Sequence, residues 1–277
     1  MTWTDRQRRM LREMGLAVWS PAPPPIAVPL HLAPAPGAPP PAPPAPVAAA
    51  AAVSAPTASP VMPAPPAEAP SGDERGRQIA TLDWPALRQA VAGCQACGLC
   101  RTRGQTVFGV GHENAHWMVV GEAPGEQEDL QGEPFVGAAG QLLDSMLRAL
   151  QLTRATDGPE PPSRRVYIAN ALKCRPPRNR NPEAAEMAAC EPFLMRQIAL
   201  VQPRLILAMG RFAVQMILRS SEPVGKLRGR VHRYQGVPLV VTYHPAYLLR
   251  NLPDKARAWD DLCLAASVAE AAQEPSA

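Results

Sequence analysis

The chain has 277 residues, of which 46% are hydrophobic and 19% are charged, and its formal net charge is +4. No window approaches the ~20 apolar residues that a membrane-spanning helix needs, and the basic N-terminus lacks the apolar segment of a secretory signal. These features exclude an integral membrane protein and permit a polyanionic partner without requiring one. We therefore expect a cytoplasmic protein.

Proline divides the chain into three parts. In residues 1–20, Met10, Leu11 and Met14 recur at helical spacing among basic residues. Between Pro21 and Pro70, 19 of 50 residues are proline and 17 are alanine, a composition that supplies neither ladder hydrogen bonds nor a core. We predict an amphipathic N-terminal helix over 1–20 that docks an unidentified protein, a disordered Ala/Pro-rich linker over 21–70, and one monomeric catalytic domain over 71–277. The alternative for the head is a frayed end without a partner.

Short apolar runs alternate with helical patterns beyond the linker. A helix begins at the capping residue Asp83 and runs to 92. The apolar runs predict strands at 116–120, 166–169, 204–208 and 237–242. Further helices are predicted at 138–150, 183–201, 211–218 and 253–269. This alternation predicts a three-layer α/β/α fold with a mainly parallel central sheet.

Chemically useful side chains follow the ends of these strands, where ligands bind in such sheets. They are Glu122, Phe135, Asn170 and His244. A ring, an amide and an imidazole give a planar heterocycle a stacking face, a hydrogen-bond reader and a polar donor. Taken singly, each residue has an ordinary explanation: a solvated acid, a core ring, a turn amide or a histidine satisfied within the fold. Their common placement favours a binding site for a planar ring.

Four stretches resemble the motifs of family 4 uracil-DNA glycosylases, the iron–sulfur branch of the uracil-DNA glycosylase superfamily. They are GEAPGEQED, GEPFVGAAGQLLD, VYIANALKCRPPRNRNP and TYHPAYLLR, which occur in the family order. The resemblance covers about residues 87–262 and excludes the head and the linker. It implies a uracil-DNA glycosylase-like fold and a DNA repair enzyme that acts on uracil-containing DNA. That enzyme flips uracil out of the helix and hydrolyses its N-glycosidic bond, leaving an abasic site for base excision repair.

The resemblance also implies roles for individual residues. Glu122 matches the family's water-handling or charge-stabilising acid, and Phe135 matches the ring that stacks on the extruded base. Asn170 matches the amide that reads the Watson–Crick edge of uracil, and His244 matches the imidazole that donates to uracil O2. An expelled uracil develops negative charge at O2, so a neutral donor placed there lowers the barrier.

Ala123 departs from the pattern, because better-known members of the superfamily have aspartate at this position. The identity of the catalytic base therefore stays open. The candidates are Glu122, Glu128 and a water held by the backbone. Glu128 is also our candidate for excluding the C5 methyl group of thymine. Asn179 is a candidate for holding the water or a phosphate.

Candidate DNA contacts lie on two segments. Leu248 or Leu249 follows the histidine where superfamily members insert an apolar wedge into the base stack, although either leucine could belong to the core. A basic group suited to phosphate contacts comprises Lys173, Arg175, Arg178 and Arg180. Further candidates are Arg228, Arg230, Arg233 and Arg250, for which a solvated basic surface is the alternative.

The chain has six cysteines, which in a reducing compartment favour metal ligation or free thiols over disulfides. Cys94 and Cys97 form a C-x2-C pair, and Cys174 and Cys190 lie far downstream. Four thiolates suit a [4Fe-4S] cluster and structural zinc equally, so the spacing leaves the metal open. The resemblance implies a [4Fe-4S] cluster on these four residues. Cys100 is an alternative ligand, and free buried thiols are a further alternative.

Two competing functions are weighed against the glycosylase. One is a non-catalytic iron–sulfur or zinc module that recognises damaged or single-stranded DNA. The other is a related glycosylase that prefers another deaminated base or crosslinks to its product. Family members that crosslink carry an inserted basic-histidine segment near the second motif. The run from Cys174 to Arg180 continues without it, which favours ordinary turnover.

Overall fold

The computed structural model describes residues 72–272, so the predictions for residues 1–20 and 21–70 lie outside the described part. Within residues 72–272, six strands form one sheet in the order β1-β3-β2-β4-β6-β5. The four central strands are parallel, and each edge strand is antiparallel to its neighbour. The strands are β1 (Val110–Gly111), β2 (Trp117–Gly121), β3 (Val166–Asn170), β4 (Leu205–Met209), β5 (Val231–Tyr234) and β6 (Val237–Thr242). The predicted mainly parallel sheet is therefore confirmed.

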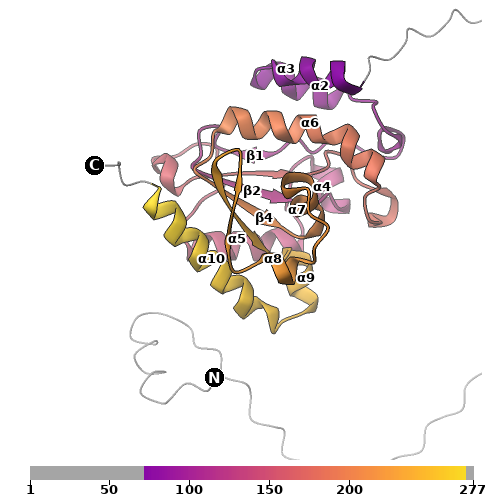
Figure 1. The fold of residues 1–277 in the computed structure, drawn as a ribbon. Helices are drawn as coiled ribbons and strands as arrows, with labels where there is room; N and C mark the ends of the chain where they lie inside the picture. The colour runs from indigo at the N-terminus through magenta and orange to yellow at the C-terminus, as the bar shows by residue number, and fades with distance from the viewer. Residues whose placement is uncertain (1–71, 273–277) are drawn as a thin grey trace, which may run out of the picture. The chain divides into compact units, whose positions relative to one another are not determined.

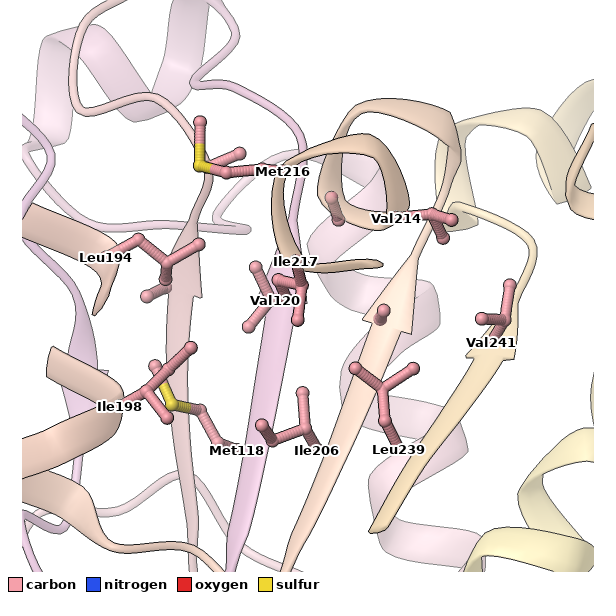
Figure 2. Packing of buried hydrophobic residues seen from close by; sticks show 14 of the residues in the cluster. Met118, Val120, Leu194, Ile198, Ile206, Val214, Met216, Ile217, Leu239 and Val241 are labelled. Carbon is pink, nitrogen blue, oxygen red and sulfur yellow. The ribbon is translucent and has the colours of Figure 1, made fainter. Parts of the chain in front are cut away.

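Helices cover both faces of the sheet (Figure 1). On one face lie α6 (Ala184–Val201) and α7 (Arg211–Leu218), and on the other lie α5 (Ala138–Ala149) and α10 (Asp254–Ala271). All five residues of β2 are buried, because successive side chains point to opposite apolar layers. Figure 2 shows Met118 and Val120 directed toward α6 and α7, together with Leu194, Ile198 and Ile217. The three-layer α/β/α prediction is confirmed.

Two N-terminal helices pack on α6. They are α2 (Gly72–Ala80) and α3 (Trp84–Ala92), and Figure 1 shows both beside α6. The predicted cap of α3 is confirmed, since a carboxylate oxygen of Asp83 accepts a 3.0 Å hydrogen bond from the Ala86 N–H. Leu87 and Val91 of α3 join a separate apolar cluster that contains Cys174, Cys190 and Phe193. This cluster places the N-terminal cysteine motif against α6.

Several short elements escape sequence prediction. They are the edge strands β1 and β5, the helices α4 (Glu126–Gln131), α8 (Val224–Leu227) and α9 (Pro245–Arg250), and three 3-10 turns at Gly98–Arg101, Pro162–Arg164 and Pro177–Asn179. Segments this short contain too few residues to display a period. Three of them, α4, α9 and the turn Pro177–Asn179, carry residues of the candidate site. In the described residues, no helix combines the length and the apolar character needed to cross a membrane.

Candidate active site

A pocket of about 400 Å³ opens at the carboxyl ends of the parallel strands. Gly121 at the end of β2 lies beside Asn170 at the end of β3, and Met209 of β4 lies beside Thr242 of β6. The segments that follow these four strands therefore meet at one rim, as the sequence predicts. Nine of the sequence-predicted site residues line this pocket: Glu122, Ala123, Glu128, Phe135, Asn170, Asn179, Arg180, His244 and Arg250.

Asn170 presents an amide oxygen that is buried and has no hydrogen-bond partner within residues 72–272. The residue is 2% exposed and lies at the end of β3. Because a buried polar atom without a partner is costly, such an atom at a pocket wall indicates that a ligand supplies the missing donor. The N3–H group of uracil is a donor of this kind.

Gly121 makes room for this arrangement. A Cβ atom at position 121 would lie 2.4 Å from the Asn170 side-chain oxygen and 2.6 Å from the Phe135 ring. Any side chain there would displace the amide or the ring. No local pattern marks Gly121, because its φ angle is not positive and only the approach of two distant segments creates the requirement.

Phe135 and His244 form a stacked pair. Their ring centroids are 5.3 Å apart and the ring planes differ by 26°. Phe135 is 5% exposed, and it lies in the segment between α4 and α5. Both rings line the pocket, as does Asn170. A planar base can stack on such a ring.

The His244 imidazole has a defined tautomer. Its Nδ1 atom accepts a 3.2 Å hydrogen bond from the Ala246 N–H at the first turn of α9, so the proton of the neutral ring is on Nε2. Burial lowers the pKa of His244 to about 4; the charge of Glu128 opposes this shift and that of Arg250 reinforces it. At neutral pH, His244 is therefore an uncharged Nε2–H donor.

Glu122 is held at the N-terminus of α7. One carboxylate oxygen accepts a 3.1 Å hydrogen bond from the Phe212 N–H. The same oxygen would be 2.5 Å from a Cβ atom at position 210, where a glycine with φ of +89° allows the close approach. Burial raises the pKa of Glu122, and the backbone N–H groups of Phe212 and Arg211 partly offset the shift.

Glu128 lies in α4, and both of its carboxylate oxygens are engaged. One accepts from the Gly125 N–H at 3.1 Å, and the other accepts from the N–H groups of Val136 and Gly137 at 3.0 and 3.2 Å. The carboxylate therefore joins the loop before α4 to the segment after Phe135. Ala123 lines the same pocket and adds no functional group to it.

The predicted DNA contacts divide into exposed residues and residues engaged within the fold. Arg178, Arg230, Arg233 and Arg250 are exposed, and so is Arg180 despite its ion pair. Arg180 forms a 2.6 Å ion pair with the buried carboxylate of Glu186, and Arg175 donates to Asn179 at 2.8 Å. Arg228 pairs with the fully buried Asp261 at 2.9 Å.

The structure corrects one prediction for this surface and decides between the two leucines of another. Lys173 is 1% exposed, so its inclusion among phosphate-contacting residues is wrong. Its ammonium group instead donates to Asn170 O and to the side-chain oxygen of Gln197 inside the protein. Leu248 is 1% exposed and belongs to the core between α5 and α10, whereas Leu249 is 41% exposed. Of the two leucines, Leu249 is the one free to enter DNA.

Five cysteines gather around a small cavity beside α6. The cavity is lined by Cys94, Cys97, Cys100, Cys174 and Cys190, together with Arg103, Lys173 and Phe193. Cys190 lies within α6. Cys97 immediately precedes the 3-10 turn Gly98–Arg101, and Cys100 lies within that turn. Cys263 lies apart from the cavity and is exposed.

The chemistry of these thiols fits a metal cluster. Burial raises the pKa of Cys97, of Cys174 and, to about 12, of Cys190, so thiolates at these positions require a cationic centre. Donors already face three of the sulfur atoms: Arg75 to Cys94 at 3.5 Å, Arg103 to Cys174 at 3.1 Å and the Lys173 N–H to Cys190 at 3.2 Å. Hydrogen bonds of this kind are part of iron–sulfur sites.

Four thiolates can hold either a single zinc ion or an iron–sulfur cluster. A tetrahedral zinc site brings four sulfur atoms to about 2.3 Å from one point. In the described part of the chain, no group of three or more His, Cys, Asp or Glu side chains is arranged to hold one metal ion. Five cysteines line one cavity, so the four thiolates that either metal centre requires are present together.

Comparison with known proteins gives a consistent result. The model of the Uracil DNA glycosylase superfamily matches residues 108–263. The chain is 41% identical to the type-4 uracil-DNA glycosylase of Archaeoglobus fulgidus, over 57% of this chain and 79% of that protein. It is 40% identical to the type-4 enzyme of Saccharolobus solfataricus over 60% and 77%, and 39% identical to that of Thermotoga maritima over 62% and 85%, respectively. The matched region contains the pocket.

Proposed function

The chain belongs to the type-4 uracil-DNA glycosylases of the uracil-DNA glycosylase superfamily, and on this premise we propose that the pocket at the strand ends receives a uracil flipped out of DNA. The protein is a hydrolase that cleaves the N-glycosidic bond of deoxyuridine in DNA. Base flipping is needed because the bond cannot be reached inside a stacked duplex. The roles below assign each step to residues of this chain.

Recognition of uracil depends on Asn170. The buried side-chain oxygen of this residue, which has no partner in residues 72–272, is the observation that carries the proposal. The unpartnered side-chain oxygen accepts the N3–H of uracil, and the amide NH₂ donates to O4. Cytosine presents an unprotonated N3 and an amino group at these positions, so both hydrogen bonds fail. Rejection by a buried amide is strong, because the mismatched base leaves polar groups unsatisfied.

Phe135 and His244 act on the flipped base from its face and its edge. The Phe135 ring stacks on uracil and holds it outside the helix. The Nε2–H of neutral His244 donates to O2, where negative charge develops as the bond breaks. A donor that is already oriented and uncharged stabilises the leaving group without a proton transfer.

Glu122 serves the sugar and the water. One of its oxygens is fixed by the N-terminus of α7. The other oxygen stabilises the positive charge that develops on the sugar, or it orients the attacking water. Glu128 is less suited to this work, because three backbone N–H groups occupy its carboxylate. We assign Glu128 to holding the Phe135 segment and to bordering the C5 position of the base. Asn179, at the mouth of the pocket, holds a phosphate or the water.

The exposed basic residues and one leucine contact DNA. Arg178 and Arg250 supply phosphate contacts, and Arg175 and Arg180 support the same surface through their pairs with Asn179 and Glu186. Leu249 enters the base stack and compensates part of the cost of unstacking. Leu248 anchors the same turn in the core.

The cofactor proposed for the cysteine cavity is a [4Fe-4S] cluster on Cys94, Cys97, Cys174 and Cys190, with Cys100 as the alternative ligand. When bound, the cluster supplies a structural crosslink, since hydrolysis transfers no electrons. Its ligands come from the segment after α3, the segment after β3 and α6, so it joins elements that are distant in the chain. Arg75 and Arg103 place positive charge beside the thiolates.

A non-catalytic DNA-binding module is not favoured. Such a module has no need for a half-buried carboxylate of raised pKa and a neutral imidazole around one amide. The deciding experiment incubates the full chain with an oligonucleotide that contains one uracil, followed by alkaline cleavage of abasic sites. We expect free uracil and strand cleavage at the uracil position. An intact strand after prolonged incubation with cluster-loaded protein would refute the proposed activity, and matched thymine and cytosine oligonucleotides are the controls.

A further inference from the structure

The backbone of Phe135 lies in a region that is unfavourable for an aromatic residue. Its φ angle is +57°, in the left-handed region that glycine and asparagine adopt more readily. Non-glycine residues persist there only where their surroundings hold them, and such positions cluster at functional sites. The contacts that hold Phe135 therefore determine where its ring lies.

The side chain of Arg154 grips this backbone from outside the pocket. One guanidinium nitrogen donates to the carbonyl of Phe135 at 2.9 Å, and the other donates to the carbonyl of Pro134 at 2.6 Å. The two donors of a planar guanidinium thus fix two successive peptide units. Arg154 does not line the pocket, so it cannot touch the base.

Arg154 is itself fixed on two sides. Its guanidinium pairs with the Asp144 carboxylate of α5 at 3.2 Å. The preceding residue, Thr153, makes an isolated bridge with Arg165, and the Val166 N–H donates to the Thr153 carbonyl at 2.9 Å. The arginine therefore transmits the position of β3 and α5 to the Phe135 backbone.

Gly140 also holds the Phe135 carbonyl in place, and we call Arg154 and Gly140 together the clamp. A Cβ atom at this position of α5 would lie 1.8 Å from the Phe135 carbonyl oxygen, so only glycine allows the carbonyl to reach its observed position. The carbonyl is held between the guanidinium and the helix backbone.

We propose that Arg154 is a positioning residue for uracil excision, which holds the Phe135 backbone in its left-handed conformation so that the ring faces the flipped base. The proposal rests on the stacking role assigned to Phe135. Without the guanidinium, the Pro134–Val136 segment relaxes and the ring leaves its stacking position. Arg154 thus acts on the chemistry only through Phe135.

The test compares Arg154→Met with wild type in single-turnover excision of uracil at saturating enzyme. Methionine keeps the length and apolar stem of the side chain and removes every donor. We expect a rate lower by on the order of 10-fold to 100-fold, as for other small misplacements in active sites. Arg154→Lys should recover part of this loss, because an ammonium group can donate to one of the carbonyls. Arg148→Met, at an exposed arginine of α5, is the matched control and should keep the wild-type rate.

A double-mutant cycle with Phe135→Ala separates positioning from general destabilisation. If Arg154 acts through the ring, Arg154→Met adds no more than about twofold to the defect of Phe135→Ala. If the fold-decreases in rate of the two single variants multiply in the double variant, the proposal is overturned. A wild-type rate in Arg154→Met would also overturn it. A wild-type rate in Phe135→Ala would instead remove the stacking role itself, and the clamp with it.

A second variant reaches the same carbonyl without altering Arg154. Gly140→Ala should lower the excision rate and should likewise add little to Phe135→Ala. Far-UV circular dichroism and the thermal midpoint establish that each variant is folded. A folded Gly140→Ala protein with unchanged excision would contradict the clamp, even if Arg154→Met could not be purified.

Discussion

The ammonium group of Lys173 donates a 2.8 Å hydrogen bond to the backbone carbonyl of Asn170, and the Lys173 N–H donates to the Cys190 sulfur at 3.2 Å. One buried residue therefore joins the cysteine cavity to the amide that faces the pocket. The ammonium group also donates to the side-chain oxygen of Gln197 at 2.6 Å. The NH₂ group of Gln197 in turn donates to the Phe108 carbonyl and to the Tyr167 hydroxyl. A cation this deep in a protein is tolerated only with such partners.

The Lys173 network should matter for stability. Lys173→Met leaves the carbonyl of Asn170 and the Gln197 oxygen buried without a donor, so we expect a loss of about 2–5 kcal/mol in the free energy of unfolding. Urea denaturation measures this loss. Lys226→Met, at an exposed lysine of α8, is the control and should stay within about 0.5 kcal/mol of wild type. Equal stabilities for the two variants would show that the network contributes nothing.

Asn170→Asp should impair recognition more than folding. The carboxylate still accepts from N3–H, but it cannot donate to O4 and places negative charge against that oxygen, so we expect the excision rate on uracil to fall by about 100-fold or more. The thermal midpoint is measured in parallel, because the substitution adds a buried charge. If excision stays at the wild-type rate, Asn170 does not read the base.

His244 should be neutral across the physiological range. Its pKa in the folded chain is lowered to about 4 by burial, below the ordinary value of about 6.5. Between these two values the unfolded chain binds a proton that the folded chain does not, so the His244 contribution to stability declines as pH falls from 6.5 toward 4. NMR titration of the imidazole measures this directly. A His244 resonance that titrates near pH 6.5 would contradict a neutral donor that is set by burial.

Leu248 and Leu249 should separate stability from DNA distortion. Leu248→Ala opens a cavity in the core between α5 and α10, with an expected loss of about 2–5 kcal/mol in the free energy of unfolding. Leu249→Ala should leave stability within about 0.5 kcal/mol and slow excision from duplex DNA more than from single strands. Equal slowing on both substrates would show that Leu249 does not compensate unstacking.

The cysteine cavity should yield a brown protein when the chain is purified without oxygen. Iron and acid-labile sulfide are assayed for four of each per chain, as the [4Fe-4S] stoichiometry requires. Serine at Cys174 or Cys190 should lower iron content and thermal stability, whereas Cys263→Ser, at an exposed cysteine outside the cavity, should change neither. Cys100→Ser decides the remaining ligand question. A colourless protein with stoichiometric zinc would overturn the cluster.

Sequence patterns predicted much of the fold and the position of the site. Apolar runs and helical periods predict the four central strands and the long helices. They do so because an element buried between or against other layers must carry apolar side chains within its own sequence. The ends of parallel strands must meet at one rim, so the sequence alone places Glu122, Asn170 and His244 together. The family motifs added the roles that these residues are expected to play.

Only the tertiary structure decides how each side chain is used. Lys173 looks like its basic neighbours in sequence, yet it is buried because the segment after β3 passes beneath α6. Leu248 and Leu249 are adjacent and chemically identical, and the orientation of α9 places one in the core and one on the surface. The contact of Arg154 with the Phe135 carbonyl joins positions 19 residues apart. Periodicity reports which face of an element is buried, whereas partners such as these depend on how distant segments pack.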